Sequence, residues 1–182
     1  MEITLPHIIE SNTGEKLSFF RKVTRDGIEY VEGETEVQPN AGPPMHVHFR
    51  QDEAMTVITG KIGYQVLGEE KQYAGPGETV LFKAGVPHKF WNAGPDLLRC
   101  SAYITPPDNV VYFLSALFRS ANQNGGRPSM YDAAFLLTRY RSEYAMLEIP
   151  KLVQQIIFPI VLFWGTILGW HNRFRDAPPP VK

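Results

Sequence analysis

The sequence has very little cysteine and no excess of charge of either sign. Cys100 is the only cysteine among 182 residues, which excludes an intramolecular disulfide framework and any cysteine-rich zinc site. The 18 Lys and Arg residues nearly balance the 19 Asp and Glu residues, so the basic surplus typical of nucleic-acid-binding proteins is missing. The first residues lack the basic segment and apolar run of a signal peptide. These absences favour a cytoplasmic protein that does not bind nucleic acid.

Composition changes near Asp108. Residues 1–108 carry 10 Lys/Arg against 15 Asp/Glu, whereas residues 109–182 carry 8 against 4, and 11 of the 15 glycines precede Asp108. In the first part, short apolar or alternating runs are separated by turns rich in Gly and Pro, which predicts a mainly β fold, either a sandwich or a barrel. In the second part the apolar residues follow a helical period. We therefore expect a β-barrel over residues 1–107 and a helical extension over residues 108–182.

Two helices are predicted in the extension. Asp108 is placed to cap the first helix, whose apolar face consists of Val110, Phe113, Leu114 and Leu117. Ser129 and Asp132 stand at capping-box spacing before the second helix, which we expect to continue to Pro150. The apolar stripe of this second helix consists of Ala133, Leu137, Tyr140, Tyr144 and Leu147.

Three of the five histidines lie near one glutamate. His46 and His48 are two residues apart on a predicted strand, so their side chains point to the same face of the sheet. Glu53 begins the next strand, and His88 follows about one hairpin later. In a closed barrel these four side chains can converge on one divalent ion. The simpler alternative is that surface histidines happen to cluster near a turn.

The chemistry of this set suits a metal ion. Three neutral imidazoles and one carboxylate are suitable ligands for Fe(II), Mn(II), Ni(II) or Zn(II). On an octahedral ion, four protein ligands leave two positions for water, dioxygen or a chelating substrate. An ionised glutamate inside a barrel is destabilising without a partner, and a bound cation removes that penalty. We therefore predict one divalent ion as cofactor.

Two segments resemble the two motifs of the cupin family. Residues 46–60, HVHFRQDEAMTVITG, resemble the first motif, with HxH, a glutamate five residues after the second histidine, and Gly60 seven residues after the glutamate. Residues 77–92, GETVLFKAGVPHKFWN, resemble the second motif and end in Asn92. The resemblance implies a small double-stranded β-helix, or jelly-roll barrel. It also implies a ligand set, which is His46, His48, Glu53 and His88.

Two turn positions depart from the cupin pattern. Asn40 stands where the first motif has its leading glycine, and Gly42 is displaced by two residues. Lys83 stands where the second motif usually has proline. Both departures lie in turns, so they concern local backbone detail rather than the ligand set.

Strand parity predicts an apolar pocket beside the ion. If Glu53 points into the barrel, Met55 and Val57 do so as well, and Phe90 follows His88 in the same way. Small-molecule sites commonly combine apolar walls with a few polar groups. The alternative is that these three side chains only fill the barrel. The sequence marks no second carboxylate or lysine as a general base.

Three functions are compatible with such a site. The leading hypothesis is a metal-dependent, dioxygenase-like oxidoreductase acting on a small organic molecule. The alternatives are a non-catalytic cupin that binds or senses a small ligand, and a metal-dependent isomerase or lyase of a sugar or oxyacid. One fold hosts many chemistries, so the resemblance does not choose among them. A homodimer is expected.

Residues 152–170 form a run of 19 residues without a formal charge. Lys151 precedes the run, and His171, Arg173 and Arg175 follow it. Its length approaches the roughly 20 residues that span a bilayer, but Gln154, Gln155 and Pro159 interrupt it. We expect the run to pack within the protein or its oligomer. Contact with a membrane surface and a true membrane span are the alternatives.

Overall fold

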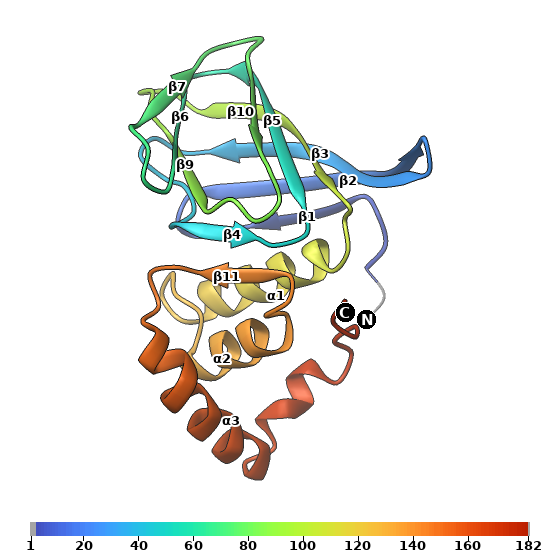
Figure 1. Cartoon of the computed structure of the whole chain (residues 1–182), viewed down its shortest axis with the longest axis vertical. Helices are drawn as coiled ribbons and strands as arrows, with labels where there is room; N and C mark the ends of the chain where they lie inside the picture. Colours follow the sequence, from blue (N-terminus) through green and yellow to red (C-terminus); the bar gives the residue numbers. More distant parts are fainter. Residues whose placement is uncertain (1–2, 182) are drawn as a thin grey trace.

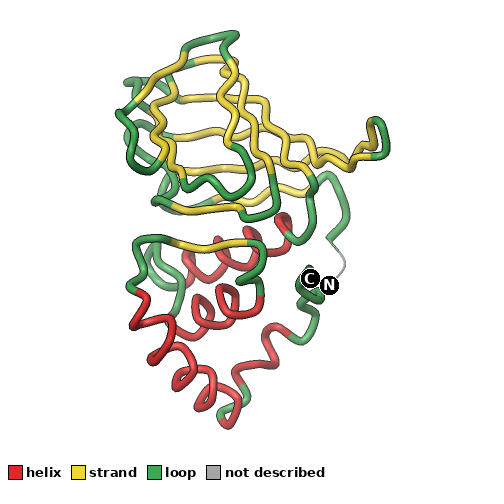
Figure 2. Tube along the Cα trace, viewed as in Figure 1, coloured by secondary structure: helices red, strands yellow, loops and turns green. Residues whose placement is uncertain are grey.

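The computed structural model describes residues 3–181, with a barrel of β-strands at one end and a group of helices at the other (Figure 1). Figure 2 shows the same division by structure type, with one short strand lying beside the helices. The strands are β1 (His7–Glu10), β2 (Glu15–Arg25), β3 (Ile28–Val37), β4 (His46–His48), β5 (Asp52–Thr59), β6 (Ile62–Val66), β7 (Gln72–Ala74), β8 (Thr79–Phe82), β9 (His88–Asn92), β10 (Leu98–Thr105) and β11 (Tyr144–Met146).

The strands form two antiparallel sheets. One sheet has the order β1-β2-β3-β10-β5-β8 and the other has the order β11-β4-β9-β6-β7. Between β3 and β10 the chain passes back and forth between the two sheets. This arrangement is the double-stranded β-helix, so the predicted fold class is confirmed. The sequence analysis did not predict β1 or β11.

Side-chain alternation fills the barrel. On β9, His88, Phe90 and Asn92 are buried, whereas Lys89 and Trp91 are more exposed. The buried Asn92 amide donates to the carbonyls of Val37 (2.8 Å) and Asp96 (2.7 Å), so it fixes the backbone at the end of β9. The barrel core consists of Val37, Met55, Val57, Ile62, Ala74, Val80, Phe82, Phe90, Leu98 and Cys100.

The turn before β4 explains one departure from the cupin pattern. Asn40 has φ +64°, in the left-handed region that asparagine tolerates better than most residues. Gly42 lies so close to β9 that an added Cβ would collide with the Phe90 carbonyl. Asparagine therefore serves at the first of these positions, and glycine is required at the second.

The helices follow β10, and α1 lies against the end of the barrel while α3 lies farthest from it (Figure 1). They are α1 (Val110–Gln123), α2 (Met130–Arg139) and α3 (Phe158–Ile167), with a π-helical turn η1 (Val153–Ile157) and a 3-10 turn η2 (Trp170–Phe174). Phe19, Val31 and Ile104 from the barrel share a core with buried side chains of α1 and α2. The barrel and the helices therefore have a common apolar interface.

Asp108 does not cap α1, contrary to the prediction. Asn109 occupies the N-cap position and makes no capping hydrogen bond with its side chain. The Asp108 carboxylate instead accepts hydrogen bonds from Arg50 Nε (3.1 Å) and Gln51 Nε2 (3.0 Å). Asp108 therefore fastens the start of α1 to the segment after β4.

The second helix begins as predicted and ends earlier. The Ser129 hydroxyl accepts a hydrogen bond from the backbone N–H of Asp132 (3.1 Å), which confirms the predicted cap. The helix ends at Arg139 rather than at Pro150. Tyr144, predicted on the helix, lies on β11, which pairs with β4. Pairing with a distant strand overrides the helical spacing of the tyrosines.

The segment after Pro150 forms η1 and α3. Pro159 at the start of α3 lacks an N–H, and the turn before it is π-helical. Phe158 and Gly165 are the buried residues of α3. Among residues 3–181, no helix is long and apolar enough to cross a membrane.

Candidate metal centre

Three strands position the four predicted ligands. His46 and His48 lie on β4, His88 is the first residue of β9, and Glu53 lies on β5 in the other sheet. His46 and His88 are directly opposite each other in the β4–β9 pair. Each of the four residues offers a ligand atom within 4.8 Å of those of the others. The structure therefore brings together all four side chains that the sequence analysis named.

Backbone carbonyls orient two of the imidazole rings. His46 Nδ1 lies 2.9 Å from the carbonyl oxygen of Pro44, and His88 Nδ1 lies 2.8 Å from that of Val86. A carbonyl oxygen can only accept, so each Nδ1 carries a proton and donates. In the neutral ring this leaves the Nε2 lone pair free to bind a metal, an arrangement common among metal-binding histidines.

The contacts of Glu53 with the imidazoles would be stabilised by a positive charge among these side chains. Glu53 Oε2 lies 3.2 Å from His88 Nε2 and 3.7 Å from His48 Nε2. Because His88 already donates through Nδ1, a neutral ring would direct its Nε2 lone pair at the carboxylate oxygen. A proton or a metal ion removes that repulsion. Among residues 3–181 the buried His48 Nδ1 has no hydrogen-bond partner.

The electrostatics of the cluster match the needs of a divalent ion. Burial, together with the neighbouring His48 and His88, lowers the pKa of His46 to about 3. Burial also lowers the pKa of His48. Burial opposes the ionisation of Glu53, but the hydrogen bond with His88 and the other two imidazoles outweigh it and lower its pKa to about 2. Neutral imidazoles and an ionised carboxylate are the forms that bind Fe(II), Mn(II), Ni(II) or Zn(II), so the residues fit such an ion.

Aromatic rings hold the ligands in place. The Phe82 ring stacks on His88 with centroids 3.9 Å apart and planes 5° apart. Tyr144 of β11 meets the edge of His48 at 5.4 Å. The Gln51 amide donates to the Tyr144 hydroxyl (3.3 Å), and burial raises the pKa of that hydroxyl well above its usual range. The tyrosine therefore stays neutral, and its ring lines the cavity beside His48.

A cavity of about 140 Å³ opens beside the cluster. His46, His48 and Glu53 line it, and its other walls are mostly apolar. The barrel contributes Leu17 and Phe90 among others. The helical segment and β11 contribute Phe113, Leu114, Leu117, Phe118, Tyr144, Ala145 and Met146. The cavity therefore lies between the barrel and the helices.

The predicted pocket residues differ in their access to the cavities. Phe90 lines both the cavity at the cluster and a smaller adjoining cavity of about 50 Å³, and Met55 and Glu53 also line the smaller one. Val57 lines neither cavity. It points into the barrel as predicted, but it lies two residues further along β5, where it packs in the core at 1% exposure. As substrate contacts, Met55 and Phe90 stay predictions.

Glu15 is a second carboxylate in the cavity, and the sequence analysis missed it. Glu15 and Leu17 at the start of β2 both line the cavity. Lys16 between them instead pairs with Glu36 at 3.3 Å. No hydrogen bond or ion pair holds the Glu15 carboxyl among the described residues. Burial, with a smaller effect from Glu53, raises its pKa to about 7. The alternating sequence Glu15-Lys16-Leu17 was an available signal for this inward position.

Comparison with known proteins agrees with this fold. Residues 33–104 match the family model Cupin_2, described as a cupin domain. This part of the chain is therefore a cupin domain, and the cluster described above lies within it. No curated protein matches the chain.

Three solved structures illustrate the likeness. A conserved protein with a double-stranded β-helix domain from Klebsiella pneumoniae is 22% identical, with a TM-score of 0.46 over 53% of this chain and 76% of that one. KdgF from Halomonas sp. is 17% identical, with a TM-score of 0.48 over 58% and 92%. The DMSP lyase DddQ from Ruegeria pomeroyi is 17% identical, with a TM-score of 0.37 over 41% and 37%.

Proposed function

We propose that this protein is a mononuclear metal enzyme, a dioxygenase-like oxidoreductase that acts on a small and largely apolar organic molecule. The observation that carries the proposal is the cluster of His46, His48, Glu53 and His88, whose ligand atoms lie within 4.8 Å of one another beside an apolar cavity. A site built only for structural metal binding has no need of such a cavity.

The residues of the chain have separable roles in this proposal. The four ligands would hold one divalent ion, which when bound supplies Lewis-acid and redox chemistry to a chelating substrate. Phe90, Leu114 and Leu117 bind the apolar part of the substrate and exclude water. Phe82 and Tyr144 hold His88 and His48 in fixed orientations.

Glu15 favours a second candidate, a metal-dependent isomerase or lyase. Such reactions require a base that takes a proton from carbon beside a polarised carbonyl group. The Glu15 carboxyl lines the same cavity as the cluster and has no structural partner among residues 3–181.

The first test is elemental analysis of untagged protein with matched histidine variants. We expect about one Fe, Mn or Ni per chain in the wild type, and its loss in His48→Ala. His171→Ala is the control, because His171 is exposed on η2 and outside the cluster. Absence of metal from the wild type, even after reconstitution, would contradict the proposal.

Oxygen dependence separates the two enzymatic candidates. The metal-loaded protein is screened with phenols, diketones and carboxylates, with and without dioxygen. Uptake of dioxygen that depends on substrate supports the oxidoreductase. Turnover without dioxygen that Glu15→Gln abolishes supports the isomerase or lyase. Tight substrate binding without turnover under either condition supports the non-catalytic alternative.

A further inference from the structure

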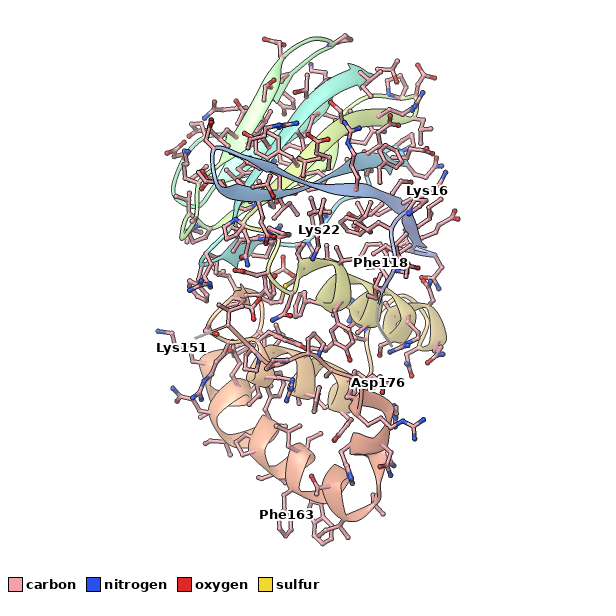
Figure 3. All side chains as sticks on the ribbon, turned by 90° about the vertical axis from the view of Figure 1, so that its right-hand side faces the viewer. Lys16, Lys22, Phe118, Lys151, Phe163 and Asp176 are labelled. Carbon is pink, nitrogen blue, oxygen red and sulfur yellow. The ribbon has the colours of Figure 1, made fainter. Side chains whose placement is uncertain are left out.

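The outer face of α3 is an apolar surface that no other part of residues 3–181 covers. Ile160, Phe163, Trp164 and Ile167, named here the α3 stripe, recur at helical spacing i, i+3, i+4, i+7. Their exposed fractions are 51%, 62%, 56% and 60%. Figure 3 shows Phe163 projecting from the tip of the molecule that lies farthest from the barrel. A helix in a water-soluble domain normally directs such a stripe inward.

Packing on the opposite side holds the stripe outward. Phe158 is 2% exposed, and Gly165 lies against the Tyr131 ring of α2 so closely that an added Cβ would collide with it. Trp170, just beyond α3, also contacts Tyr131, with ring centroids 5.5 Å apart. Rotation of α3 to bury the stripe would break these contacts. The apolar surface is therefore built into the folded chain.

Basic side chains flank α3 along the sequence. No Asp or Glu occurs between residues 149 and 175, and Glu148 and Asp176 stand directly outside this range. Lys151 before η1 and Arg175 after η2 are both exposed, and neither forms an ion pair within the described part of the chain. Arg173 contacts Asp132 at 3.1 Å but keeps 48% of its side chain exposed. This end of the molecule therefore combines apolar side chains with positive charge.

We propose that the α3 end docks on an anionic membrane surface without crossing the bilayer. The α3 stripe would enter the region between headgroups and acyl chains, and Lys151 and Arg175 would contact lipid phosphates. Tryptophan and basic residues are typical anchors at this depth. The two Trp residues of this end, Trp164 and Trp170, are 56% and 39% exposed.

Charge and shape favour a membrane over a second copy of the chain. The core of a protein interface is depleted of charge, and each partner of a stable dimer contributes about 800 Å². The α3 stripe lies on one helix near the tip that Figure 3 shows farthest from the barrel, and Lys151 and Arg175 lie beyond the two ends of this helix in the sequence. Two such ends would repel each other, whereas anionic lipid complements them.

The experiment is flotation of the full chain with vesicles of phosphatidylcholine alone or mixed with phosphatidylserine. We expect the wild type to bind the anionic vesicles, and Phe163→Ser/Trp164→Ser to bind them about tenfold or more weakly. The matched control is Leu67→Ser/Leu81→Ser, which removes side chains of 56% and 45% exposure from the barrel and leaves binding unchanged.

Charge is tested separately. Lys151→Gln/Arg175→Gln should weaken binding to anionic vesicles by about tenfold. The same change should not weaken binding to neutral vesicles. Added salt should weaken the wild type more than this variant. Equal losses on both kinds of vesicle would contradict the contact with lipid phosphates.

Trp164 gives a readout that does not depend on a destabilising variant. On anionic vesicles, Trp164 emission should move to shorter wavelength, and Trp164→Phe should keep the binding but lose most of this change. A wild type that does not bind anionic vesicles overturns the proposal. So does a dimer that Phe163→Ser/Trp164→Ser dissociates in the absence of vesicle binding, because the face is then an interface between copies.

Discussion

Two regions of the molecule depart in opposite ways from the usual arrangement of a folded chain: the cluster, where the barrel meets the helices, and the outer face of α3. Near β4 and β9, His48 and His88 are 6% and 1% exposed beside the ionised Glu53. At α3, Phe163 and Trp164 are 62% and 56% exposed. Polar groups are buried in the first region, and large apolar groups face water in the second. Each arrangement is unfavourable for the chain alone.

The two regions differ in the kind of partner that would stabilise them. The cluster is suited to one cation, and its side chains are held by β-pairing and by stacked rings. The α3 stripe needs an extended apolar surface, and only one side of its helix is fixed. We therefore expect substitutions around the cluster to affect folding and metal binding together. Substitutions on the stripe should affect association alone.

The largest effect on stability is expected from phenylalanine, which is compared beside the cluster and on the α3 stripe. Phe82 is 2% exposed and stacks on His88, so Phe82→Ala should destabilise the protein by about 3–5 kcal/mol. Phe163→Ala should change stability by no more than about 0.5 kcal/mol, because Phe163 faces solvent. Urea unfolding of both variants measures the contrast. Similar losses would show that Phe163 packs against the protein in solution.

A pH dependence should come from Glu15 in the metal-free protein. Its pKa in the folded state is about 7, against an ordinary value of 4.5. Folded protein then keeps a proton that unfolded protein has lost, so the contribution of Glu15 to stability is largest below pH 4.5 and is lost as the pH rises to about 7. The difference in pKa corresponds to about 3 kcal/mol.

Glu15→Gln should remove this dependence. The variant should exceed the wild type in stability above pH 7, and the advantage should shrink toward pH 4.5. Unfolding free energies of both proteins in a chelator, measured between pH 4 and pH 8, give the difference. A difference that is constant across this range would mean that the cavity does not raise the pKa of Glu15.

A smaller effect is expected where α3 meets α2. Gly165→Ala should force α3 away from Tyr131 and destabilise the protein by about 1–3 kcal/mol. Hydrogen exchange should become faster in α3 and stay unchanged in the barrel. Thr166→Ala is the control, because Thr166 is the next residue and is exposed. Faster exchange in β4 or β9 would show that the stability of the strands around the cluster depends on the packing of α3.

The smallest effect is expected at the cap of α2. Ser129→Ala removes the hydroxyl that accepts from Asp132 N–H and should destabilise the protein by about 1 kcal/mol. Thr138→Ala, an exposed change on the same helix, should not be destabilising. Thermal unfolding of the two variants tests the contrast. An equal shift in Tm would mean that the cap adds nothing to stability.

Local periodicity predicts a mainly β fold for the first part of the chain, because the side chains of a strand alternate with a period of two. The resemblance to the cupin motifs is what implies the jelly-roll barrel. Strand parity correctly predicts that Met55 and Phe90 are buried inside the barrel. The spacing of His46, His48 and Glu53 follows from the same rule, applied to neighbouring strands. These features depend on residues close in sequence, and a single sequence therefore reveals them.

Features that depend on distant pairing are not predicted in this way. The spacing of Tyr144 indicates a helix, but Tyr144 lies on a strand. The partner strand, which contains His48, lies almost a hundred residues earlier, so local spacing gives no sign of the pairing. The inward position of Glu15 beside the cluster depends on closure of the barrel. The orientation of α3 depends on Gly165 and Tyr131, because a helix that is apolar on all sides gives no signal of which side faces inward.

The short strand β11 determines where the chain can be truncated without exposing an edge of the barrel. β11 is the edge strand of its sheet, and it covers β4, which holds His46 and His48. A fragment ending at Thr105 would leave β4 as an unprotected edge, open to pairing with other chains. We expect such a fragment to aggregate and to lose metal in elemental analysis. If the cluster binds a metal as proposed, the segment needed for binding therefore reaches at least to Met146, well past residues 33–104, which match the cupin family.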